Sequence, residues 1–218
     1  MLTKEIRLYV YKQFSHLGTA PSVSQIASYF DISEDQVRDE LLKLAEARHI
    51  AINDEFEILM AHPFSSIPLG FSVMGAKTLW WGGCSWDSFA LPNLLIQEVV
   101  VATTCPNCNS AHAWRVNPDT PPQGEQIAHF LIPTKEMWVD VVHTCGNQRI
   151  FCNESCLETW LHRTNNQEGY VMGLSTLWAL ASHWYEGRLE LEYQRRDPST
   201  SLQYFREVGL SGSFWGLD

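Results

Sequence analysis

The stretch Leu79-Trp80-Trp81-Gly82-Gly83-Cys84-Ser85-Trp86-Asp87-Ser88-Phe89 joins a predicted strand to a predicted helix. Its two glycines let the backbone approach closely, and the helix is expected over residues 85–91, before a proline at 92. Cys84 therefore lies at the N-terminus of this helix, a position that lowers the pKa of a thiol. Asp87 lies three positions further along, on the same helical face. The stretch predicts a reactive thiolate with a carboxylate beside it.

The segments around this stretch predict an α+β fold with a mixed, mostly antiparallel sheet and several helices. The predicted strands are 71–73, 77–81, 97–103, 111–116, 129–132, 138–143, 150–151 and 189–193. The predicted helices are 85–91, 154–162, 174–185 and 198–208. A loop rich in proline and glycine is expected at 117–125.

The N-terminal residues are typical of a winged helix, with three helices followed by a two-stranded wing at 51–58. Ser22 or Ser24 is expected to cap the second helix, and Ser33 the third. Residues 61–68 contain two prolines and predict a linker. We therefore expect a winged-helix-like domain at residues 1–62 and an α+β catalytic domain at residues 63–218.

The charge of the N-terminal part disfavours binding to nucleic acid. Residues 1–60 hold six Lys or Arg and ten Asp or Glu side chains, and the third helix begins Ser33-Glu34-Asp35. Such a surface repels phosphates, whereas nucleic-acid binding depends on neutralising them. A packing or dimerisation role is the preferred interpretation, and assembly as a homodimer is left open.

The composition is that of a globular protein with an acidic surface. The chain has 218 residues, of which 45% are hydrophobic and 18% charged, and its formal net charge is −10. It has no apolar run long enough for a transmembrane helix and no secretory signal at its start, so no membrane association is expected. These features predict a cytoplasmic location, where thiols stay reduced and clustered cysteines bind metals or react.

Four of the six cysteines form two closely spaced pairs. The pairs are Cys105-Pro-Asn-Cys108 and Cys152-Asn-Glu-Ser-Cys156. This pattern predicts a tetrahedral structural Zn(II) site with four thiolate ligands, the first pair on a turn between strands and the second at the start of a helix. The alternatives are four free core thiols, or a site in which Cys145 replaces one ligand.

The segments around the two remaining cysteines, Cys84 and Cys145, are similar to those of a known family. The segment Trp81–Phe89, the pair Thr104-Cys105, and Cys145 followed fifteen residues later by Trp160 together resemble the organomercurial lyase (alkylmercury lyase) family. The resemblance covers roughly residues 20–190, including the winged-helix-like N-terminal part. The sequence departs from the family at Gly146, where a second cysteine is common, and in its additional cysteines at 108, 152 and 156.

The resemblance implies protonolysis of a carbon–mercury bond. Cys84 and Cys145 would be the thiolates that hold mercury, Asp87 the residue that relays a proton to carbon, and Cys105 a structural cysteine. The implied substrate is a small organometallic compound, Hg(II) is the product, and no organic cofactor is needed. Small thiols or a metal-accepting reductase would then take the product. A soft metal prefers thiolates, and apolar walls such as Trp86 would exclude water.

Two other functions agree with the same residues. A regulator that senses metals or thiols could use the winged helix, although its third helix is acidic. An enzyme that shares the lyase scaffold could instead use Cys84 as a nucleophile or soft-metal ligand in another pathway. Motifs for dinucleotides, phosphates, zinc proteases and serine hydrolases are missing from the sequence.

Overall fold

A computed structural model describes residues 1–217 of the chain. Its helices are α1 (Leu2–Leu17), α2 (Val23–Phe30), α3 (Glu34–Glu46), α4 (Ser85–Leu95), α5 (Val141–Gly146), α6 (Glu154–Thr164), α7 (Leu174–Ser182), α8 (Pro198–Glu207) and the 3₁₀ helix η1 (Ser213–Trp215). Its strands are β1 (Ala51–Ile52), β2 (Ile58–Ala61), β3 (Phe64–Ser65), β4 (Phe71–Met74), β5 (Leu79–Gly82), β6 (Val99–Thr104), β7 (Ala111–Val116), β8 (Ile127–Phe130), β9 (Gln148–Phe151) and β10 (Tyr170–Gly173).

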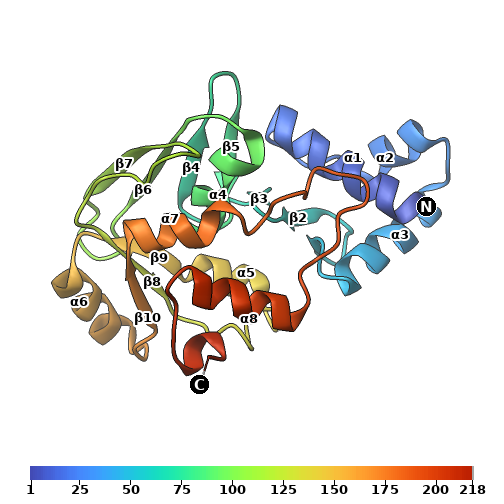
Figure 1. Ribbon diagram of the computed structural model, residues 1–218. Helices are drawn as coiled ribbons and strands as arrows, with labels where there is room; N and C mark the ends of the chain where they lie inside the picture. Colours follow the sequence, from blue (N-terminus) through green and yellow to red (C-terminus); the bar gives the residue numbers. More distant parts are fainter. Residues whose placement is uncertain (218) are drawn as a thin grey trace.

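A seven-stranded sheet forms the centre of the molecule, in the order β1-β2-β3-β5-β4-β6-β7 (Figure 1). Its strands pair antiparallel throughout, so the expected α+β class with antiparallel strands is confirmed. The sheet crosses residue 62 without interruption, because β3 joins β2 to β5. The predicted linker at 61–68 is therefore wrong, and the two expected domains share one sheet.

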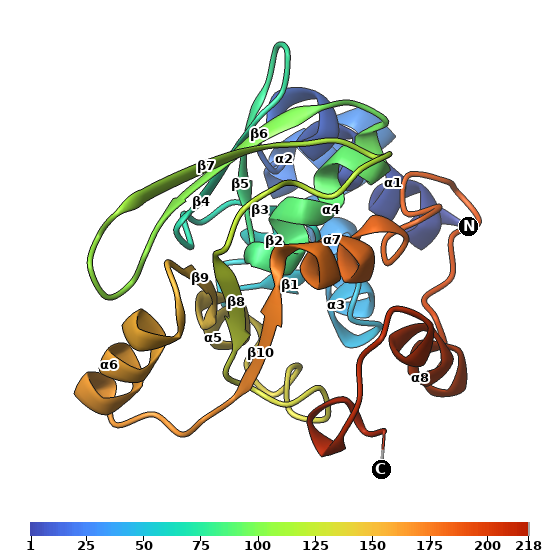
Figure 2. The ribbon, with the colours of Figure 1, turned by 60° about the vertical axis from the view of Figure 1, so that its left-hand side comes forward.

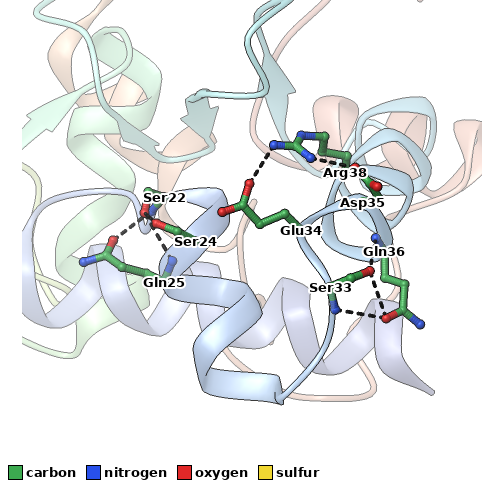
Figure 3. A network of polar contacts seen from close by, with 8 residues as sticks. All are labelled: Ser22, Ser24, Gln25, Ser33, Glu34, Asp35, Gln36 and Arg38. Atoms are coloured by element: carbon green, nitrogen blue, oxygen red, sulfur yellow. Dashed lines mark hydrogen bonds and ion pairs between the residues drawn. The ribbon is translucent and has the colours of Figure 1, made fainter.

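Three helices precede the sheet, and α3 packs against α1, α2 and β1 (Figures 1 and 2). Figure 3 shows how two of them begin: Ser22 and Ser33 each accept a hydrogen bond from the backbone N–H three residues on, and the glutamine there reaches back. These two capping boxes satisfy backbone donors that the first turn leaves free. Ser22, rather than Ser24, is the cap of α2.

Arg38 on α3 is neutralised by carboxylates of its own helix (Figure 3). Its guanidinium lies 2.7 Å from Glu34 and 2.7 Å from Asp35. The charge of this arginine is therefore paired within the third helix.

A second sheet of three antiparallel strands, in the order β10-β8-β9, lies near α4 and α7 (Figure 2). Helices α4 and α7 pack against each other in both views, and α4 also contacts β4, β5, β6 and β9. The residues of α4 from Ser85 to Pro92 are all buried. Burial on every side explains why this helix continues to Leu95, although Pro92 was expected to end it.

Two predicted strands are wrong. Residues 138–143 were expected to form a strand, but Val141–Gly146 is the helix α5. Asp140 caps this helix by accepting a hydrogen bond from the backbone N–H of His143 at 2.9 Å, which favours the helical turn. Residues 189–193 form turns and irregular chain in place of the last predicted strand.

The segment that links α7 to α8 runs back across the N-terminal helices (Figure 1). Arg7 of α1 is buried and donates hydrogen bonds to the backbone carbonyls of Arg188 and Glu190. Tyr11 of α1 accepts a hydrogen bond from the Arg188 side chain at 2.7 Å. The first helix thereby fixes the position of residues 188–190. Over residues 1–217, no helix is both long and apolar enough to cross a membrane.

Candidate functional site

Cys84 is the N-cap of α4, directly after strand β5. Its sulfur accepts a hydrogen bond from the backbone N–H of Asp87 at 3.4 Å. Both side chains are buried, at 2% and 1% exposure. The strand-turn-helix arrangement expected from the sequence is present, and it directs the thiol and the carboxylate into the same part of the interior.

Cys145, from the last turn of α5, reaches the same place from another part of the chain. Its sulfur lies 3.8 Å from Oδ2 of Asp87, and the two thiols are close enough for each to shift the pKa of the other. Three residues from two distant segments, Cys84, Asp87 and Cys145, therefore converge in one buried cluster. Cys145 is not part of the four-cysteine group.

Two further polar side chains complete this cluster. Nε2 of His62 lies 3.5 Å from the sulfur of Cys145, and the ring is 5% exposed. The hydroxyl of Tyr185 donates a hydrogen bond to Oδ1 of Asp87. The imidazole, the carboxylate and the Cys145 sulfur offer ligand atoms within 4.8 Å of one another.

The two thiols differ in acidity. Burial raises the pKa of Cys84 well above 9.0, and the neighbouring Cys145 thiol adds to the increase. The neighbouring Cys84 thiol lowers the pKa of Cys145. Burial opposes this effect, and the positive charge of His62 supports it. The expectation that the helix N-terminus lowers the pKa of Cys84 is wrong, because desolvation outweighs the helix dipole. Cys145 is the more acidic thiol.

Tyr185 and His62, the two polar groups close to Asp87 and Cys145, both have a raised pKa. Burial and the Asp87 charge raise the pKa of Tyr185 well above 10.0, so its hydroxyl remains a donor. Burial lowers the pKa of His62, but the negative charges of Asp87 and Cys145 more than offset this, and the pKa is raised above 6.5. These charges therefore favour the imidazolium form of His62 beside the thiolate form of Cys145.

A cavity of about 700 Å³ opens onto the cluster. Cys84, Asp87, Cys145, His62 and Tyr185 all line it. Its apolar wall is made of large rings, which are Trp86, Trp138, Trp184, Phe205 and Trp215. The ring of Trp86 packs against those of Trp184, Phe205 and Trp215, with centroids 4.8, 6.2 and 6.0 Å apart, so these four rings form a continuous surface. The cavity can enclose a small apolar molecule and separate it from water.

The four remaining cysteines form a second cluster. Cys105 and Cys108 lie on the turn between β6 and β7, whereas Cys152 and Cys156 lie at the start of α6. All four sulfurs lie within 4.8 Å of one another. The sulfurs of Cys108 and Cys152 are 3.4 Å apart, and those of Cys108 and Cys156 are 3.8 Å apart. Figure 1 shows α6 at the opposite end of the molecule from α1–α3.

His62, for which the sequence predicted no role, lies at the site, whereas His143, two positions before Cys145, does not. His143 is exposed and contacts Asn147 on its own helix. His62 and Tyr185 lie 83 and 98 positions from their partners in the cluster. No local spacing connects them with a cysteine or an aspartate. Their burial as polar residues is a signal that only the tertiary structure supplies.

Comparison with known proteins gives the class to which this site belongs. The MerB alkylmercury lyase family matches residues 64–186, which is more than half of the chain. The chain belongs to the alkylmercury lyase family, as the resemblance implied. Among solved structures, a crystal structure of the mercury-bound form of MerB2 has a similar fold, with a TM-score of 0.65. The two chains are 16% identical, over 86% of this chain and 91% of that one. None of the curated proteins matches in sequence.

Proposed function

We propose that this protein cleaves carbon–mercury bonds by protonolysis, with Cys84 and Cys145 as the mercury-holding thiolates and Asp87 as the proton relay. The main support for this proposal is the 3.8 Å distance between the Cys145 sulfur and the Asp87 carboxylate inside an aromatic cavity. Two soft ligands and one carboxyl group are what the reaction requires. Family membership supports the same reaction.

Cys145 makes the first bond to mercury. It is the more acidic thiol, and His62 lies beside it to accept its proton. Its thiolate attacks the mercury of a thiol-bound compound, R–Hg–SR′. The Hg–SR′ bond breaks with its electron pair on sulfur, and the departing thiolate takes up the proton that Cys145 released.

Cys84 then binds the same mercury, and its proton passes to Asp87. The backbone N–H at 3.4 Å stabilises the developing sulfur charge. Two thiolates increase the electron density on the metal and on the attached carbon. Asp87 protonates that carbon, the C–Hg bond breaks with its electrons on carbon, and hydrocarbon leaves. One thiol proton ends in the hydrocarbon and the other in R′SH, while Hg(II) remains on two sulfurs.

The four-cysteine cluster is proposed as a structural Zn(II) site held by Cys105, Cys108, Cys152 and Cys156. Four sulfurs at about 2.3 Å from a tetrahedral zinc lie about 3.8 Å apart. The observed separations of 3.4 and 3.8 Å fit this donor set. The local core is small, consisting of Cys105, Phe151, Leu157 and Trp160, so a metal would add stability that packing alone supplies weakly.

The N-terminal part is proposed to be a winged-helix-like domain at residues 1–62 that supports the cavity wall. Three helices and the antiparallel β1–β2 pair support this assignment. Arg7 and Tyr11 hold the segment at 188–190, which lines the cavity through Arg188. The paired charges of Arg38 support a packing role for this part over binding of nucleic acid.

Hydrocarbon release tests the proposed reaction. Purified protein is incubated with phenylmercury and excess small thiol, and benzene is measured by gas chromatography. Cys84→Ser, Cys145→Ser and Asp87→Asn should each abolish release. Asp119→Asn is the matched control, since Asp119 is an exposed carboxylate on the loop after β7 and does not line the cavity. Full turnover in any of the three variants would contradict the assignment of that residue.

A further inference from the structure

The cavity is rich in positive charge, although the protein as a whole is acidic. Its lining includes five cationic side chains, Arg48, Lys135, Arg188, Arg195 and Arg196, and two carboxylates, Glu46 and Asp87. The chain carries a net charge of −10. A concentration of arginine at one cavity in an acidic protein is unexpected if the site takes only neutral molecules.

The arginines are held by aromatic rings. The guanidinium of Arg195 lies 4.7 Å from the ring centroid of Trp138, and that of Arg48 lies 5.9 Å from the same ring. Arg196 lies 5.9 Å from the Trp184 ring. Stacking on a ring orients a guanidinium without neutralising it, so its hydrogen-bonding groups remain free for a ligand.

Within residues 1–217, none of the four cavity arginines forms an ion pair with a carboxylate. Arg195 and Arg196 donate to backbone carbonyls, those of Arg48 and His183. Arg188 is 5% exposed, and its buried Nε has no hydrogen-bond partner in this part of the chain. A buried cation usually has an anionic partner. Because no carboxylate of residues 1–217 pairs with Arg188, we expect its counter-ion to be a ligand bound in the cavity.

The arginines are close to the reacting groups. The rings of Trp138 and His62 have centroids 5.5 Å apart, and His62 contacts the Cys145 sulfur. Arg48 and Arg195 are thus separated from the mercury-holding sulfur by one aromatic ring and one imidazole. Arg188 lies 4.8 Å from the ring of Tyr185, which bonds Asp87. An anion on the substrate would meet these cations while its mercury meets the thiols.

We propose that the arginine-lined cavity recognises a carboxylate on the mercury compound, and that the preferred substrates are therefore carboxylate-bearing organomercurials or mercury compounds carried by a carboxylate-bearing thiol. The inference rests on the proposed lyase function. It assigns to Arg48, Arg188, Arg195 and Arg196 a role in substrate specificity. The aromatic rings hold the organic group, and the guanidinium groups bind the carboxylate.

The binding test needs neither mercury nor turnover. Benzoate and benzamide have nearly the same shape, and only benzoate is charged. Titration followed by the fluorescence of the cavity tryptophans should show that benzoate binds about tenfold more tightly than benzamide. The preference should fall severalfold in Arg195→Gln and in Arg196→Gln. Equal affinity for the two probes in the unmodified protein would overturn the proposal.

Arg115→Gln is the matched control, because Arg115 is exposed and pairs with Glu98 away from the cavity. It removes one positive charge and should leave the benzoate preference unchanged. Thermal unfolding of each variant identifies loss of structure, and the second arginine variant, at a residue that stacks on a different ring, covers the case in which the first does not fold. An equal effect of Arg115→Gln would mean that only net charge matters, and would also overturn the proposal.

Turnover then separates the two sources of the carboxylate. The kcat/KM for 4-carboxyphenylmercury and for phenylmercury is measured with 2-mercaptoethanol and with 3-mercaptopropionate. A higher kcat/KM for 4-carboxyphenylmercury with either thiol would show that the carboxylate on the organic group is recognised. A higher kcat/KM with 3-mercaptopropionate for either mercury compound would show that the carboxylate on the carrier thiol is recognised. Equal values in all four arms would contradict the specificity role. Release of no hydrocarbon in any arm would reject the lyase function, while the benzoate titration still decides on anion binding.

Discussion

Nε2 of His62 lies 3.5 Å from the sulfur of Cys145, although 83 positions separate the two residues. His62 directly follows β2, and Cys145 lies in the last turn of α5, so the two residues come from distant parts of the sequence. Both side chains are buried, and the pair lies next to Asp87. An imidazole at this distance can stabilise the thiolate form of the cysteine. Four predictions follow from this site and from the second cysteine cluster.

The first prediction concerns the reactivity of Cys145. The pKa of Cys145 is lowered below 9.0 and that of Cys84 is raised, so a small alkylating agent should modify Cys145 before Cys84 at pH about 8. His62→Gln removes a positive charge that lowers this pKa, and the rate profile for Cys145 should therefore shift to higher pH. Peptide mass mapping after timed iodoacetamide treatment measures the rate at each cysteine.

His143→Gln is the control for this experiment. His143 is exposed, two positions from the same cysteine, and bonded to Asn147. Its replacement should leave the profile of Cys145 unchanged. If His62→Gln and the unmodified protein gave the same dependence on pH, the proposed role of the imidazole would be refuted.

The second prediction concerns Tyr185, which donates a hydrogen bond to Oδ1 of Asp87. Tyr185→Phe leaves a buried carboxylate oxygen without this donor, so the free energy of unfolding should fall by about 1–3 kcal/mol. Hydrocarbon release should also slow, because the carboxyl group loses its fixed orientation. Tyr204→Phe removes a hydroxyl that bonds the backbone carbonyls of Ala179 and Leu180. It should reduce stability comparably and leave kcat unchanged; a normal kcat in Tyr185→Phe would count against the orienting role.

The third prediction concerns the glycine before Cys84. A methyl group on Gly83 would overlap Oδ2 of Asp87 and lie 2.6 Å from Cε of Met60. Gly83→Ala should therefore displace the carboxylate and lower kcat at least about tenfold, since catalysis depends on the position of the acid to within about 1 Å. Gly146→Ala meets nothing within 4 Å, although it adjoins Cys145. Equal activity of these two alanine variants would show that the space at Gly83 is unimportant.

The fourth prediction concerns metal content. The purified protein should contain one zinc per chain by elemental analysis, and Cys152→Ser should lose it. Loss of one ligand from a structural site should lower the Tm by several degrees, since about 1 kcal/mol corresponds to about 2–4 °C in a chain of this size. Cys84→Ser should retain the zinc. Zinc-free protein with all four thiols titratable would contradict the proposed site.

The sequence by itself determined the local features of this protein. The capping serines at 22 and 33, the β6–β7 hairpin and the start of α6 follow from signals within a few residues of each position. The spacing of the four paired cysteines also predicted that they meet, because each pair lies on one turn. The turn from β5 into α4 placed Cys84 and Asp87 on one helical face for the same reason.

Tertiary structure alone decided what depends on burial and on distant contacts. The fold brought Cys145 to Asp87, added His62 and Tyr185, and reversed the expected order of acidity of the two thiols. A strand was predicted at residues 138–143, but the helix α5, which Asp140 caps, is the structure favoured in the packed chain. Pairing of residues far apart in sequence and desolvation both depend on the whole packed chain, so no short stretch of sequence contains them.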